Sequence, residues 1–187
     1  EKIEKELGGQ PVVQAKLMDA IGTVYVQLGL LDPGSRLLGK AYDLRTKTLG
    51  PDDPDTIDSV EDLAWVAEKK GDVQAALGYD QRALAFHRRR GEAGEEKVAK
   101  LLDDLGWNYV EQAKFDEAVA SIQDGLAIRE RRFGPESEEV GGSLETLAYV
   151  HFQRGEYRQA VELLRRVLAI DEQAHGKDSL QVASAAN

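Results

Sequence analysis

Four aspartates stand close together in residues 48–59, which read TLGPDDPDTIDS. They are Asp52, Asp53, Asp55 and Asp58. Oxygen-rich loops of this kind bind hard cations, but a calcium loop needs alternating ligands, a central glycine and a terminal bidentate glutamate. Pro54 and the missing glycine break that pattern. Because aspartates also stabilise a helix N-terminus, we expect this segment to cap a helix and to bind no metal.

Other residue types that could do chemistry are scattered. The three histidines, His87, His151 and His175, have no metal-ligand spacing, and His151 is expected to pack in or beside the core. The glycine pairs at 8–9 and 141–142 lack the strand, lysine and hydroxyl residue of a phosphate-binding loop. No set of residues suggests catalysis, so we expect no enzyme and no cofactor.

Composition narrows the class of protein and its partners. The chain has 187 residues, 42% of them hydrophobic and 31% charged, as in an ordinary globular protein. Its net charge of −10 argues against nucleic acid or an anionic membrane as partner. There is no cysteine, signal peptide or membrane-spanning apolar run, so we expect a cytoplasmic location. Because the chain opens on Glu1, we expect it to be part of something longer.

The dominant pattern is an internal repeat of 42 residues. The segments DAIGTVYVQLG, EDLAWVAEKKG, DDLGWNYVEQA and ETLAYVHFQRG begin at residues 19, 61, 103 and 145, with no insertion between them. Apolar residues recur at spacings of three and four on both sides of a break at Gly29, Gly71, Ala113 and Gly155. Glycine suits the left-handed residue that ends many helices, so each repeat is predicted to be a helix, a tight turn and a second helix.

This period predicts eight helices. The expected ranges are 11–28, 33–48, 55–70, 73–90, 95–112, 115–132, 136–154 and 157–174, with a short helix at 1–7 and another beginning near 178. Two columns of small residues should mark the closest approach of the paired helices. They are Gly22, Ala64, Gly106 and Ala148, and Gly34, Ala76, Ala118 and Ala160.

The third repeat carries a recognisable motif. Leu102, Leu105, Gly106 and Tyr109 are followed by FDEA at 115–118 and GLAI at 125–128, which resembles the tetratricopeptide repeat. The 42-residue spacing and the LGPDDP connector are similar to the kinesin-light-chain type of this repeat, which also occurs in bacterial multidomain signalling proteins. The resemblance implies an all-α, right-handed superhelical solenoid of four helix-turn-helix repeats.

The resemblance also implies where the repeats divide. We expect an N-terminal helix or linker at 1–10, repeats at 11–52, 53–94, 95–136 and 137–178, and a truncated fifth repeat or capping helix at 179–187. In the first repeat Asp32 is predicted to cap a helix that starts at Pro33. The family's peptide-gripping asparagine is replaced throughout by Asp19, Glu61, Asp103 and Glu145, and a carboxylate only accepts hydrogen bonds.

One face of the first helices offers a candidate binding groove. The acidic column just named runs beside an aromatic column, with carboxylate and ring four residues apart. The predicted ligand-binding residues are Asp19, Glu61, Asp103, Glu145, Trp65, Trp107, Tyr149, Glu68, Asp62 and Asp104. Such a surface suits a protein or peptide segment with basic and apolar residues. The alternative is that the aromatics pack on the preceding repeat and the acids are a solvated face.

The sequence therefore predicts a protein–protein interaction scaffold within a larger signalling or regulatory protein. The alternative is self-association, as a homodimer or regulatory arm without a peptide groove. The hydrodynamic mass of the chain would separate the two, because a peptide-binding array should be monomeric.

Overall fold

The computed structural model describes residues 9–176 of the chain, and all of its regular structure there is helical. The helices are α2 (Pro11–Gln27), α3 (Leu31–Leu49), α4 (Pro54–Lys70), α5 (Val73–Arg89), α6 (Glu95–Glu111), α7 (Phe115–Phe133), α8 (Glu138–Gln153) and α9 (Tyr157–His175), with a 3-10 turn, η1 (Gly91–Gly94), before α6. Each helix expected in this range is confirmed to within two residues at either end. The helices expected at 1–7 and near 178 lie outside the described residues.

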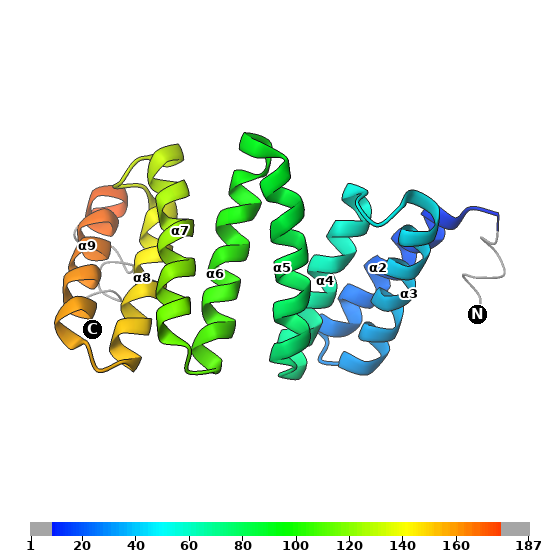
Figure 1. The fold of residues 1–187 in the computed structure, drawn as a ribbon, viewed down its shortest axis with the longest axis horizontal. Helices are drawn as coiled ribbons and strands as arrows, with labels where there is room; N and C mark the ends of the chain where they lie inside the picture. Colours follow the sequence, from blue (N-terminus) through cyan, green and yellow to red (C-terminus); the bar gives the residue numbers. More distant parts are fainter. Residues whose placement is uncertain (1–8, 177–187) are drawn as a thin grey trace. The chain divides into compact units, whose positions relative to one another are not determined.

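The helices form two compact units, Glu1–Phe86 and His87–Asn187, and the boundary falls within α5. In the first unit α2 packs on α3 and α3 on α4. In the second, α6, α7, α8 and α9 each pack on the next and stand side by side (Figure 1). Consecutive helices joined by short turns run antiparallel, as repeat arrays of helix pairs require.

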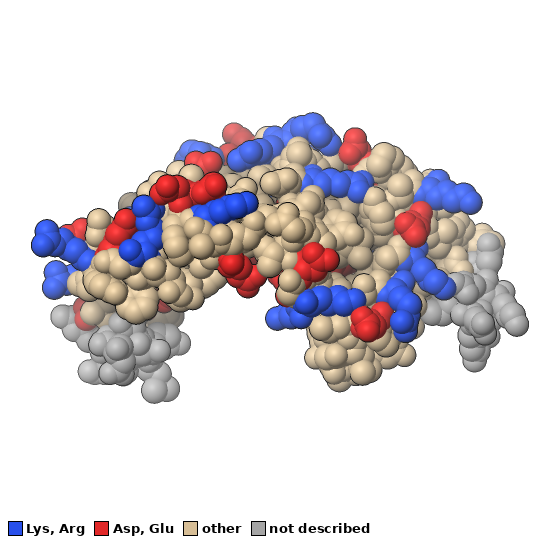
Figure 2. All heavy atoms as spheres, turned by 60° about the horizontal axis from the view of Figure 1, so that its bottom comes forward, with Lys and Arg blue, Asp and Glu red and all other residues tan. Residues whose placement is uncertain are grey.

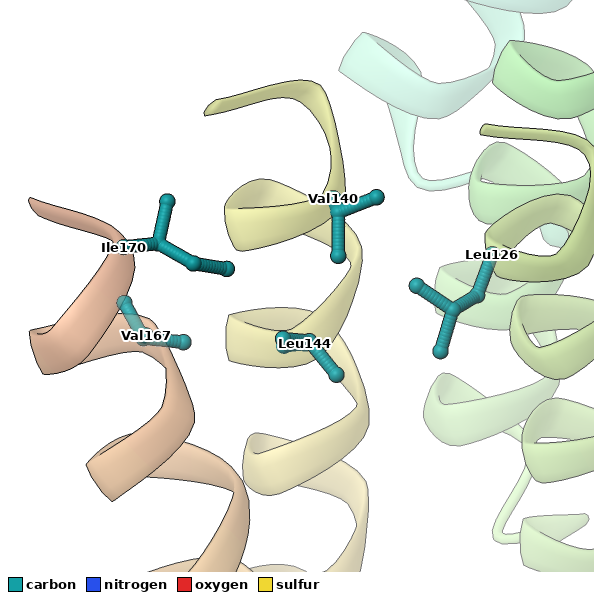
Figure 3. Close-up of a cluster of buried hydrophobic side chains, with 5 residues drawn as sticks. All are labelled: Leu126, Val140, Leu144, Val167 and Ile170. Atoms are coloured by element: carbon teal, nitrogen blue, oxygen red, sulfur yellow. The ribbon is translucent and has the colours of Figure 1, made fainter. Parts of the chain in front are cut away.

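The core of each unit lies between consecutive helices. In the first unit one cluster contains Val26, Leu38, Leu63 and Val66, and Tyr79 of α5 packs against it. In the second unit side chains of α8 lie between α7 and α9 (Figure 3). The residues of that cluster are Leu126, Val140, Leu144, Val167 and Ile170. Within each unit, apolar side chains of one helix pair therefore pack against those of the next pair.

The turns inside the repeats share one geometry. Gly29, Gly71, Ala113 and Gly155 all have positive φ, of 76°, 72°, 56° and 78°. At each turn two backbone N–H groups reach back to carbonyls of the preceding helix, as in Leu30 N–H to the Tyr25 carbonyl at 2.8 Å. This is the Schellman arrangement that closes a helix C-terminus. The predicted break in each repeat is confirmed, and Ala113 adopts the same conformation as the glycines.

The small columns lie where the helices of a pair approach each other closely. Every member of both columns is buried. A Cβ atom built on Gly34 would come within 2.5 Å of Val26 Cγ2, and one on Gly106 within 2.5 Å of Ile122 Cγ1. Larger side chains are therefore excluded at these positions, as the sequence predicts.

Helix capping explains the aspartate-rich connector. Asp53 precedes α4, and its side chain accepts a hydrogen bond from the backbone N–H of Asp55 at 2.9 Å. Pro54 occupies the first helical position, where no N–H is needed. The capping prediction is thus confirmed at Asp53.

The predicted cap at Asp32 is wrong. Helix α3 begins at Leu31, because the carbonyl of Leu30 already accepts the N–H of Gly34 at 3.1 Å. Pro33 then lies inside the first turn, where its missing N–H leaves no hydrogen bond unmade. Asp32 is exposed and forms an ion pair with Lys70 at 2.8 Å, and this hydrogen bond and charge lower the pKa of Asp32.

Candidate functional site

Two aromatic side chains of the second unit stack on its surface. Trp107 of α6 and Tyr149 of α8 have ring centroids 4.9 Å apart at an interplanar angle of 41°. They are 43% and 39% exposed, although both are large and apolar. Glu111 and Glu145 are also exposed and lie one helical turn from Trp107 and Tyr149 respectively. We call these four residues the α6–α8 face.

The equivalent aromatic of the first unit is placed differently. Trp65 of α4 is partly buried and packs against the cluster that contains Val26 and Leu63. Beside it Glu61 and Asp62 are half-buried, and Glu68 is exposed. The two alternatives for the aromatic column thus both have a basis in the structure, with Trp65 packed in a core and Trp107 and Tyr149 open to solvent.

Asp19 is held inside the first unit by a buried arginine. Arg45 of α3 places its Nη2 atom 3.1 Å from Asp19 Oδ2 of α2, and its Nη1 donates to Ser59 Oγ of α4 at 2.5 Å. One guanidinium therefore joins three successive helices. We call Asp19, Arg45 and Ser59 the first polar joint.

The second unit repeats this arrangement 84 residues later. Arg129 of α7 lies 2.8 Å from Asp103 Oδ2 of α6, and its Nη1 donates to Ser143 Oγ of α8 at 2.5 Å. Asp103, Arg129 and Ser143 form the second polar joint. The carboxylates of Asp19 and Asp103 therefore already have a cationic partner within the chain, whereas Glu145, in the same column, is exposed.

Two carboxyl groups beside the joints have raised pKa values, mainly because they are buried. Burial, followed by the hydrogen bond and the negative charge of Asp19, raises the pKa of Asp62 to about 7. Burial also raises the pKa of Asp103, although the neighbouring Arg129 opposes the change. The other oxygen of that carboxylate, Oδ1, is buried and has no hydrogen-bond partner. A carboxyl group with the pKa of Asp62 keeps its proton until the pH approaches neutrality.

The polar joints are a structural feature that a helix-by-helix reading of the sequence misses. A signal was present, because Asp19, Arg45 and Ser59 recur as Asp103, Arg129 and Ser143 at twice the repeat length. In the intervening repeat the same positions hold Glu61, His87 and Leu101. Asp104, the remaining predicted residue, is half-buried on α6.

Charges of both signs are mixed on the face drawn in Figure 2 and in the cavity beside α6. On the face drawn in Figure 2, Lys and Arg side chains alternate with Asp and Glu. A cavity of about 650 Å³ between α6 and α7 has the same mixture, with Lys97, Lys100 and Arg132 beside Glu96 and Glu139. No three His, Asp or Glu side chains in residues 9–176 are grouped as a metal site requires. Within that range no helix has the length and apolar content needed to cross a bilayer.

Comparison with known proteins identifies the family of this repeat architecture. A tetratricopeptide repeat model matches residues 13–89 and 68–131, and a second matches 140–181. No curated protein matches in sequence. The crystal structure of BtubC (BKLC) from P. vanneervenii superposes with a TM-score of 0.78 at 20% identity, covering 89% of this chain and 66% of BtubC. The chain therefore spans slightly less than two thirds of that protein.

Two further structures have the same fold. A kinesin-light-chain protein of Podosopora anserina with nearly identical TPR-like repeats has a TM-score of 0.79 at 22% identity, over 94% of this chain and 83% of that one. The apo form of RapI has a TM-score of 0.78 at 17% identity, over 93% and 62%. Since the family models match nearly all of residues 13–181, the chain belongs to the tetratricopeptide repeat family.

Proposed function

We propose that the chain is a protein-interaction module that binds a partner segment on the α6–α8 face. The observation that carries this proposal is the exposed Trp107–Tyr149 stack, flanked by two exposed carboxylates. Exposed aromatic pairs of this kind are typical centres of protein interfaces, since they bury a large apolar area with little loss of side-chain freedom.

The charges around the stack indicate the chemistry of the partner. Neither Glu111 nor Glu145 forms an ion pair with another described residue, in contrast to Asp19 and Asp103. A lysine or arginine of the partner would gain from both the carboxylates and the aromatic ring faces. The partner segment is therefore proposed to combine a basic residue with an apolar anchor. Glu61, Glu68, Asp62 and Asp104 stay predicted contributors.

The wider setting of the module is part of the proposal. The resemblance to kinesin-light-chain repeats supports a scaffold, without an enzyme activity or a cofactor, in a larger signalling or regulatory protein. A cytoplasmic location rests on composition alone. Nucleic acid and membrane are not proposed as partners, because the net charge is −10.

Self-association is the second candidate. It is favoured by Val13, Leu17 and Val24 of α2, which form an exposed apolar stripe at helical spacing. Sedimentation equilibrium distinguishes the candidates, since self-association predicts a dimer that a Leu17→Glu change converts to monomer.

Selection from a random peptide library displayed on phage tests the binding proposal. Wild-type protein should enrich peptides with Lys or Arg next to a bulky apolar residue, and binding should weaken as salt rises. Trp107→Ala should lose this enrichment. The matched control is Phe133→Ala on α7, because Phe133 is 41% exposed but lies outside the α6–α8 face. Enrichment of acidic peptides, or the same peptides selected by Trp107→Ala, would contradict the proposal.

A further inference from the structure

The end of α8 and one side of α9 carry a second exposed apolar stripe. Phe152, Tyr157, Val161 and Leu164 are 56%, 61%, 47% and 42% exposed. Phe152 and Tyr157 contact each other edge to face, with centroids 5.5 Å apart. Tyr157, Val161 and Leu164 follow one another at helical spacing along α9, so the stripe is continuous. We call these four residues the end face.

The chain shows what covers the equivalent surface one repeat earlier. The residues 42 positions before the end face are Val110, Phe115, Val119 and Ile122. There they pack against Leu147 and Val150 of α8. As a result Ile122 is fully buried, whereas its counterpart Leu164 is 42% exposed. The end face therefore has the shape and polarity of a surface that, elsewhere in this protein, is covered by a helix.

The charges beside the end face differ from those of the internal joint. The positions of Asp103 and Arg129 are held one repeat later by Glu145 and Asp171. Two carboxylates thus occupy the place of a carboxylate–guanidinium pair. Glu145 is exposed and Asp171 half-buried, and neither forms an ion pair with another described residue. A helix that covered the end face would therefore meet two carboxylates. At the equivalent place in the internal joint, Ser143 of α8 meets the guanidinium of Arg129.

We propose that the end face docks an amphipathic helix of a partner protein. That helix would carry apolar residues at the spacing of Val140, Leu144, Leu147 and Val150, and a lysine or arginine at the position that Ser143 holds in α8. The cation would lie between Glu145 and Asp171 and would replace the missing guanidinium of the joint. The apolar residues of this site differ from those of the α6–α8 face, and Glu145 borders both.

The need for a lysine or arginine at this position favours a partner protein over a second copy of the chain or the chain's own continuation. If a second copy stacked its α2 on the end face, Leu17 would take the position of Ser143, since α2 and α8 are three repeats apart. In the chain's own continuation that position is Ala185, which lies outside the described residues. Neither sequence supplies the positive charge.

Peptides derived from α8 provide matched probes. A fluorescein-labelled peptide of residues 136–154 with Gly142→Ala, to raise helicity, is made with either Ser143→Arg or Ser143→Glu. Fluorescence anisotropy against the 187-residue chain should show at least tenfold tighter binding of the arginine peptide. Leu164→Glu in the protein should abolish binding. Asp171→Asn should reduce the difference in affinity between the arginine peptide and the glutamate peptide. Gln159→Glu, an exposed residue on the other side of α9, should change neither.

Equal affinity for the two peptides, or binding unchanged by Leu164→Glu, would overturn the proposal. Circular dichroism of each variant checks that it is folded, and Asp171→Asn tests the charge preference independently of Leu164. Binding that appears only after residues 177–187 are deleted would assign the end face to the chain's own C-terminal segment. A dimer that Leu164→Glu dissociates would assign it to a second copy. Either result would also overturn the proposal.

Discussion

Trp65 and Trp107 hold the same position in successive repeats, yet one belongs to a core and the other to a surface. Trp65 packs against the cluster of Val26, Leu38, Leu63 and Val66. Trp107 is 43% exposed and its ring contacts that of Tyr149. The difference shows that register within a repeat determines the direction of a side chain, while its burial depends on what neighbouring helices supply.

The polar joints differ in a similar way. Both contain an aspartate, a buried or half-buried arginine and a serine, but only the first has an additional carboxyl group, that of Asp62. At the equivalent position the second unit has Thr146, whose hydroxyl donates to the Gly142 carbonyl at 3.1 Å. The two units therefore have the same Asp–Arg–Ser arrangement, but their stabilities should respond differently to mutation and to pH.

Removing the arginines should have the largest effect. Arg45→Met or Arg129→Met leaves a partly buried carboxylate without its partner, which costs about 3–5 kcal/mol of local stability. The loss should be greater for Arg45, because Asp19 and Asp62 then face each other without a cation. Hydrogen exchange followed by peptide mass spectrometry should locate the loss of protection in α2–α4 for Arg45→Met and in α6–α8 for Arg129→Met.

The exposed Arg36 provides the control, since Arg36→Met should leave both regions protected. If Arg45→Met and Arg129→Met reduce protection in the same peptides, the joints are not separate structural elements.

Replacing the two tryptophans should reduce the stability of the protein by different amounts. Trp65→Ala removes a ring that packs on a core, and we expect a cost of about 2–3 kcal/mol, below the value for a fully buried aromatic. Trp107→Ala removes an exposed ring and should cost less than about 1 kcal/mol. Thermal unfolding measures both, and equal shifts in Tm for the two variants would contradict the difference in burial.

The pH dependence of the first joint should have a defined sign. Folding raises the pKa of Asp62 from 3.8 to about 7, so its contribution favours the folded state below pH 4 and is lost as the pH rises through 7. Asp62→Asn should therefore be more stable than wild type at pH 8, by about 1–2 kcal/mol after allowance for solvent screening, with little difference at low pH.

Chemical denaturation at pH 4 and pH 8 measures this effect. Thr146→Asn in the second unit is the control and should show no such pH dependence. A stabilisation by Asp62→Asn that is the same at both pH values would mean that Asp62 does not titrate in this range.

The sequence predicted the fold closely because its period is strict. The apolar spacing located α2–α9, and the break residues located the turns, including the turn at Ala113. These features depend on the local conformation of the backbone, which the residues of a single repeat determine.

The site was less predictable because its contacts cross between helices. Asp19 and Asp103 were predicted to face a ligand, but each lies beside an arginine from the next helix. The burial of Trp65 and the exposure of Trp107 likewise depend on other repeats. Even the start of α3 depends on the preceding turn, since Leu30 and not Asp32 supplies the first acceptor.

The central claim is that the exposed Trp107–Tyr149 stack binds a basic and apolar partner segment. Isothermal titration calorimetry of one library-selected peptide tests it most directly, with wild type, Trp107→Ala and Phe133→Ala measured at the same ionic strength. The account predicts at least a tenfold higher Kd for Trp107→Ala, equivalent to about 1.4 kcal/mol, and an unchanged Kd for Phe133→Ala. A Kd for Trp107→Ala equal to that of wild type, in a folded protein, would contradict it.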